Sequence, residues 1–286
     1  MLTKVIVKME IVDAHQHFWK YHPVNHSWIN NEMKLIQRDF LPNELQQIFE
    51  ANKVSSCVSV QVDQTKEETL FQIACAESNS FIKGVVGWID LFDEYIQDEI
   101  ENYQHAKIVK GFRYVLQGAP EGFMLQPRFI ENLNLLANNG YTYDLLIYNN
   151  QIIEATALLK KVPNLPIVLN HMAKPKIGDN IVAWENQIKA IAQFENLSCK
   201  ISGLATEANW ESWKEADMVP YLDIIVEYFG FDRIMFGSDW PVCLLATSYE
   251  RWLTFLKTYF SKYTISTQEK FFSGNCTKFY KLNTIN

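Results

Sequence analysis

Three polar residues alternate within an apolar run near the start of the chain. In IVDAHQHFW, residues 11–19, Asp13, His15 and His17 occupy every second position. If this run is a β-strand, the three side chains share one face, and the histidines lie about 7 Å apart along it. Two imidazoles directed at one spot are typical of a metal site or a polar active centre.

A third histidine and a carboxylate follow much later in the chain. His171 lies in LNHMAKP and Asp239 in FGSDWPV. Neutral imidazole is a common metal ligand, and a carboxylate often completes the set while a position stays open for water or substrate. We therefore expect His15, His17, His171 and Asp239 to be metal ligands. Asp239 can also take a proton from a water, which makes it the expected general base.

Further polar and aromatic residues lie near the ends of strand-like runs and are expected to bind substrate. Arg113 offers a planar fork of donors for sugar oxygens or a carboxylate, whereas Lys200 offers a point charge. Trp88 and Trp240 could stack on a sugar face. Gln61 ends another such run and is the fifth expected substrate-binding residue.

Each assignment has a plainer structural alternative. Buried histidines can simply hydrogen-bond one another in a packed core, and an aspartate at a strand end can cap the next turn. Arg113 or Lys200 could pair internally with Asp144 or Asp239. Most tryptophans in a core only pack.

The candidate residues can meet only if the elements between them bring distant parts of the chain together. Strand-like runs alternate with amphipathic helical stretches along the whole chain. The predicted strands are 11–18, 55–63, 82–91, 108–116, 141–148, 166–173, 197–204 and 233–240. Eight strands alternating with helices predict a (β/α)₈ TIM barrel of the α/β class, whose active site lies at the carboxyl ends of the strands. An open doubly wound sheet is the alternative, but no Gly-rich phosphate loop follows a strand.

Helix boundaries carry recognisable signals. A helix is expected over 43–53, where Leu45, Ile48 and Phe49 form an apolar stripe. The other boundary signals are a capping box of Thr65 with Glu68, a helix opened by Pro127 and closed by Gly140, and a second capping box of Ser266 with Glu269.

Composition limits the classes of protein that the chain can represent. With 48% hydrophobic residues it can build a large core, and we expect one domain over residues 1–286. The net charge of −7 without a basic stripe argues against nucleic acid as a partner. No membrane span or signal peptide is recognised, so a cytoplasmic location without a membrane partner is expected. Five cysteines without a C-x-x-C pair argue against a disulfide framework. The oligomeric state stays open, and a homo-oligomer is compatible with the sequence.

Several ordered motifs together resemble a known family. They are DAHQHFW, QRDFLPNEL, GVVGWIDL, KGFRYVLQ, LNHMAKP, CKISGL, RIMFGSDWPV and GNCTKFYKL. The set, from about residue 11 to residue 282, is similar to the amidohydrolase-related sugar-lactone hydrolases that include L-fuconolactonase and L-rhamnono-lactonase.

The resemblance implies hydrolysis of an aldonolactone to the sugar acid, with His171 and Asp239 as catalytic residues. One divalent ion, preferably zinc, would lie on the histidines, although relatives in this branch also suggest catalysis without a tightly bound metal. A two-metal centre is not expected, because the bridging residue and the additional histidine of binuclear relatives have no counterpart. A metal-dependent decarboxylase on the same barrel, or a non-catalytic sugar-binding barrel, remains the alternative.

Overall fold

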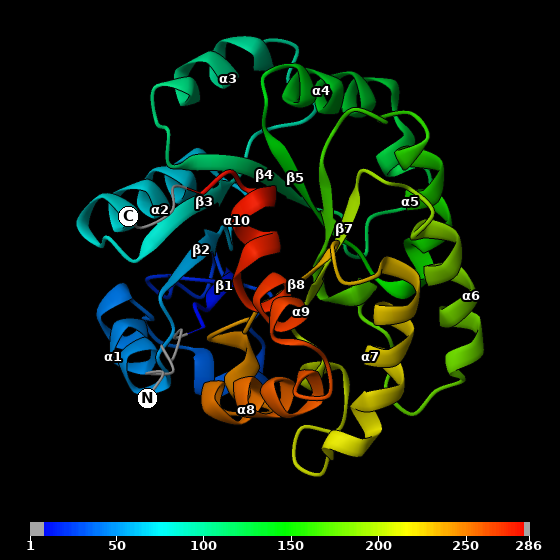
Figure 1. Cartoon of the computed structure of the whole chain (residues 1–286). Helices are drawn as coiled ribbons and strands as arrows, with labels where there is room; N and C mark the ends of the chain where they lie inside the picture. The colour runs from blue at the N-terminus through cyan, green and yellow to red at the C-terminus, as the bar shows by residue number, and fades with distance from the viewer. Residues whose placement is uncertain (1–8, 283–286) are drawn as a thin grey trace, which may run out of the picture.

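The eight predicted strands form one parallel sheet. The computed structural model describes residues 9–282, and its strands follow one another around the sheet in chain order (Figure 1). They are β1 (Val12–Gln16), β2 (Ser56–Val60), β3 (Ile82–Gly87), β4 (Val109–Val115), β5 (Thr142–Leu146), β6 (Ile167–Leu169), β7 (Leu197–Ile201) and β8 (Ile234–Phe236). Each observed strand lies within its predicted run, so the prediction is confirmed, with shorter strands than expected.

The sheet closes where the end of the chain meets its beginning. The backbone of Asp239 donates to the carbonyl of His15 (N–O 2.8 Å), and His17 donates to the carbonyl of Trp240 (2.7 Å). These bonds join the segment after β8 to the end of β1. The expected (β/α)₈ TIM barrel is therefore confirmed.

Most helices surround the barrel and cover the outer face of the sheet, whereas the last one lies across one end of the barrel (Figure 1). They are α1 (Pro42–Asn52), α2 (Lys66–Ser78), α3 (Ile96–Gln104), α4 (Pro127–Asn138), α5 (Ile152–Leu159), α6 (Ile181–Ile191), α7 (Glu215–Phe229), α8 (Tyr249–Phe260), α9 (Ile265–Glu269) and α10 (Asn275–Phe279). Because side chains on both faces of the strands are covered, β1, β2 and β5 are buried at every position.

Most helix boundaries follow the signals in the sequence. The Thr65 hydroxyl accepts from the backbone N–H of Glu68 (3.1 Å), and Pro127 is the first residue of α4. The predicted cap at Ser266 is wrong: the N-cap of α9 is Thr264, two residues earlier, and its hydroxyl accepts from the backbone N–H of Thr267 (3.2 Å). The segment TISTQE contains three hydroxyl residues, and only Ser266 has a glutamate three residues later; the helix instead begins after Thr264, whose hydroxyl also contacts that of Thr267 (3.0 Å).

The single domain over 1–286 stays a prediction, since residues 1–8 and 283–286 lie outside the described part. Within residues 9–282, no helix is long and apolar enough to cross a membrane.

Candidate active site

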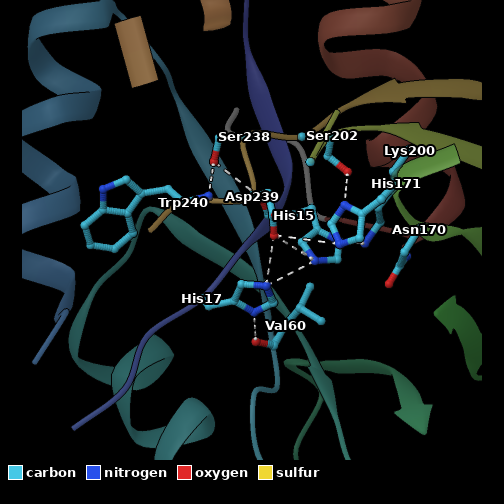
Figure 2. Close-up of polar contacts among 12 residues, drawn as sticks. His15, His17, Val60, Asn170, His171, Lys200, Ser202, Ser238, Asp239 and Trp240 are labelled. Atoms are coloured by element: carbon cyan, nitrogen blue, oxygen red, sulfur yellow. Dashed lines mark hydrogen bonds and ion pairs between the residues drawn. The ribbon is translucent and has the colours of Figure 1, made fainter. Parts of the chain in front are cut away.

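Three imidazoles surround one carboxylate oxygen inside the mouth of the barrel. Oδ1 of Asp239 lies 3.8 Å from Nε2 of His15, 3.3 Å from Nε2 of His17 and 3.7 Å from Nε2 of His171 (Figure 2). All four side chains are buried. The predicted convergence of residues from the two ends of the chain is therefore what the structure has.

The second ring nitrogen of each histidine is held by its own partner. Nδ1 of His17 lies 2.8 Å from the Val60 carbonyl, which can only accept, so His17 carries its proton on Nδ1 and directs the Nε2 lone pair at the cluster. Nδ1 of His171 lies 2.8 Å from the Ser202 hydroxyl (Figure 2).

His15 has a cationic partner instead. Nζ of Lys200 donates to its Nδ1 (3.3 Å), and a guanidinium nitrogen of Arg113 lies 3.4 Å from its Nε2. Both cations can only donate, whereas neutral His15 accepts at one ring nitrogen alone, so the two compete for its lone pair.

Burial keeps the imidazoles uncharged. It lowers the pKa of His17, lowers that of His171 to about 3, and together with Lys200 lowers that of His15 far below its usual value. Burial alone would raise the pKa of Asp239, but the neighbouring imidazoles of His171 and His17 outweigh this, and its pKa is lowered. At neutral pH the cluster is thus an ionised carboxylate among neutral imidazoles.

This donor set fits a divalent metal ion. Ligand atoms of His15, His17 and Asp239 all lie within 4.8 Å of one another. Neutral imidazole and carboxylate are the groups that zinc prefers, and His17 has the carbonyl partner that orients a metal-binding imidazole.

Two residues of the site have a left-handed backbone that normally favours glycine. Asp239 has φ +59°, and His171 has φ +53°. Each such conformation costs about 1–2 kcal/mol, and it is retained where the surrounding structure requires the side chain's direction.

Gly203, which the sequence analysis missed, provides space for both residues. It follows β7 with φ +63°, and a Cβ atom there would lie 2.6 Å from Nδ1 of His171 and 3.0 Å from Oδ2 of Asp239. Its place in CKISGL, two residues beyond a buried strand, is the signal in the sequence that could have identified it.

A cavity of about 360 Å³ opens above the cluster at the carboxyl ends of the strands. His17, His171, Asp239 and Arg113 line it, as expected. The lining residues that were not predicted from the sequence are Asn25, Ser27, Trp28, Val62, Asp63, Gln64, Val115, Gln117, Leu146, Lys174 and Val242. Most of these residues lie in loops that follow strands, where no periodic pattern indicates which side chains turn inward.

The other expected substrate-binding residues do not line this cavity. Lys200 is buried in an ion pair with Asp144 (2.5 Å), which is the plainer alternative for this lysine. Trp240 is fully buried and packs edge-on against Phe18 and Phe40, so its ring is part of the core.

Gln61 and Trp88 also lie away from the cavity surface. Gln61 is buried and its side-chain amide donates to the carbonyl of Arg113 (3.0 Å), so it supports the arginine. Trp88 is half-buried beside Tyr114, with ring centroids 6.4 Å apart.

The barrel, the histidine–aspartate cluster and the sequence place the chain in a class of hydrolases. The model of the amidohydrolase family matches residues 12–282, so the chain belongs to that family. It is 32% identical over 251 residues to an L-fucono-1,5-lactonase of Burkholderia multivorans, with 84% of each chain covered. It is 26% identical over 216 residues to an L-rhamnono-gamma-lactonase of Scheffersomyces stipitis, covering 66% of this chain and 64% of the relative.

A solved structure has the same fold. An amidohydrolase from Burkholderia multivorans with bound zinc superposes with a TM-score of 0.92 at 30% identity, covering 96% of this chain and 99% of that one.

Proposed function

We propose that the protein is a lactonase that opens a sugar-acid lactone, such as L-fuconolactone or L-rhamnonolactone, to the free acid. The observation that carries the proposal is the ionised Asp239 among three neutral imidazoles at the base of a cavity. The names of the two relatives, L-fucono-1,5-lactonase and L-rhamnono-gamma-lactonase, support this substrate class.

The charges that line the cavity favour a neutral, hydroxyl-rich substrate. Asp63 and Asp239 are balanced by Arg113 and Lys174, and Lys174 is itself paired with Glu207 at 3.0 Å. The described cavity therefore has no surplus of positive charge. An anionic substrate such as an aromatic acid or a dicarboxylate would require such a surplus. Asn25, Ser27, Gln64 and Gln117 add polar groups for hydroxyls.

In this mechanism Asp239 accepts a proton from a water that attacks the lactone carbonyl. His171, which lines the cavity beside Asp239, contacts the carbonyl oxygen as negative charge develops there, and His15 lies behind it in the cluster. Arg113 holds substrate oxygens at the wall of the cavity. A divalent ion such as zinc, held by His15, His17, His171 and Asp239, would supply Lewis-acid polarisation of the carbonyl when bound.

Acid release from a panel of aldono-1,5- and aldono-1,4-lactones tests the function, with and without chelator and with metal analysis of the sample. We expect turnover of at least one lactone. Binding of the lactones without turnover would favour a sugar-binding barrel, and carbon dioxide release from an aromatic acid would favour a decarboxylase; either result would overturn the proposal.

Asp239→Asn tests the general base. We expect kcat to fall by a factor on the order of 10² or more, because the amide cannot accept the proton from water. The exposed Asp179→Asn is the matched control and should keep wild-type kcat. A folded Asp239→Asn protein with near-normal turnover would remove Asp239 from this role.

A further inference from the structure

We propose that Lys174 is a catalytic residue that donates a proton to the ring oxygen leaving the lactone carbonyl. This rests on the proposed lactonase function. Opening the lactone turns the ring oxygen into an alkoxide, a poor leaving group unless a donor protonates it. Asp239 and the imidazoles account for the attacking water and the carbonyl oxygen, so the leaving oxygen still lacks a partner.

The backbone places Lys174 beside the catalytic histidine. The four residues from His171 to Lys174 all have positive φ, between +50° and +57°, and none is glycine. The backbone N–H of Lys174 donates to the carbonyl of His171 (2.8 Å), which closes a left-handed turn. In a turn with this i to i+3 bond, the first and fourth side chains lie on the same side.

The side chains divide accordingly. His171 and Lys174 both line the cavity, whereas Met172 and Ala173 between them are fully buried in the core. A left-handed conformation is unfavourable for every residue other than glycine. The fold thus sustains backbone strain over a turn whose two outer residues both line the cavity, and such strain is found where function requires it.

The Lys174 ammonium is held by one carboxylate and keeps further N–H donors for a substrate. Nζ lies 3.0 Å from a carboxylate oxygen of Glu207, from the loop after β7, and the lysine side chain is 20% exposed. An ammonium has three donors, so two remain after this pair. Arg113, the other cation among the described lining residues, already faces the Gln61 carbonyl and His15.

The proton and electron balance is complete without another reactant. Water adds to the carbonyl carbon and gives one proton to Asp239. When the bond from that carbon to the ring oxygen breaks, the electron pair stays on the oxygen, which takes a proton from Nζ of Lys174. The new carboxylic acid returns a proton to Nζ, and Asp239 releases its own to solvent, so one proton is released for each lactone opened.

Kinetics of Lys174→Met on the full-length protein test this assignment. We expect kcat to fall by a factor on the order of 10², with KM changed by less than about threefold, because the proton is needed only as the bond breaks. Lys174→Arg keeps the positive charge but is a much weaker proton donor, so its kcat should lie between the two. A kcat within about threefold of wild type, or a change in KM alone, would overturn the proposal.

Lys176→Met is the matched control, because this lysine lies two residues further on, is exposed and does not line the cavity. It should keep wild-type kcat and KM. If Lys174→Met does not fold, Glu207→Gln carries the test: without its carboxylate partner the ammonium is less well positioned, and kcat should fall about three- to thirtyfold. Unchanged kinetics of Glu207→Gln would then contradict the proposal.

The two proposals fail in different ways. A wild-type protein that opens no lactone overturns the proposed function. A wild-type protein that opens one, with a Lys174→Met variant equally active, overturns only the role of Lys174.

Discussion

At the scale of single residues, the site requires a position without a side chain, Gly203, as well as its polar side chains. Gly203 leaves the space in which the imidazole of His171 and the carboxylate of Asp239 meet. The two side chains would otherwise have to separate, since a methyl group cannot fit at 2.6 Å from a ring nitrogen.

Replacing Gly203 by alanine should therefore damage activity more than stability. We expect kcat/KM to fall at least tenfold and the free energy of unfolding to fall by about 1–3 kcal/mol, measured by lactone turnover and urea denaturation. Gly178→Ala is the control: its φ is +94° and nothing lies within 4 Å of the added Cβ, so it should lose stability while turnover is kept. Equal losses of activity in the two variants would contradict this explanation.

At the scale of elements, the amino-terminal end of α2 is tied to the rim of the cavity. Glu68 in the first turn accepts from the backbone of Val62 (3.0 Å) and from the side chain of Gln72 (2.9 Å), and Val62 lines the cavity. Burial raises the pKa of the Glu68 carboxyl to about 7.

This raised pKa predicts a pH dependence of stability. The folded state binds the proton more tightly than the unfolded chain, where a glutamate titrates near 4.3, so the contribution of Glu68 is complete below about pH 4 and is lost as pH rises to about 7. Between pH 5 and pH 7.5, we expect the unfolding free energy of Glu68→Gln to fall less than that of the wild type, by on the order of 2–3 kcal/mol. Identical declines in the two proteins, measured by urea denaturation, would refute it.

The order and number of elements could be predicted because their patterns are local. The parallel strands are largely buried on both faces and appear as apolar runs, so all eight were found. The same reasoning placed His15, His17, His171 and Asp239 together. Lys174 could not be found in this way, since its direction comes from a left-handed turn that no periodicity indicates.

At the scale of the whole molecule, a buried charged network crosses the barrel interior. Lys200 on β7 pairs with Asp144 on β5, and the hydroxyl of Tyr280, just beyond α10, donates to the other oxygen of Asp144 (2.7 Å). Lys200 was predicted to bind substrate because the sequence indicates its position on a strand but does not indicate which side chains from other strands it contacts. The side chain that meets it comes from a strand two positions away in the sheet.

Removing one charge of this pair should lower the unfolding free energy more than removing both charges. Lys200→Met leaves the carboxylate of Asp144 buried without its cation, and we expect a loss of about 3–5 kcal/mol in unfolding free energy. Lys200→Met combined with Asp144→Asn should lose less, because the amide can still bond Tyr280 and Asn170. A double variant at least as unstable as the single one, in urea denaturation, would show that the charge on Asp144 is not the cause.

The bonds that close the barrel also have a consequence for how the protein folds during its synthesis. They join residues 15–17 to residues 239–240, so the barrel closes at the histidine–aspartate cluster itself. The ribosome must therefore synthesise the chain from β1 through β8 before His15 can meet Asp239. A chain that ends before β8 lacks Asp239 and cannot complete the cluster, so the onset of the proposed lactone turnover during refolding would report that β1 and the segment after β8 have met.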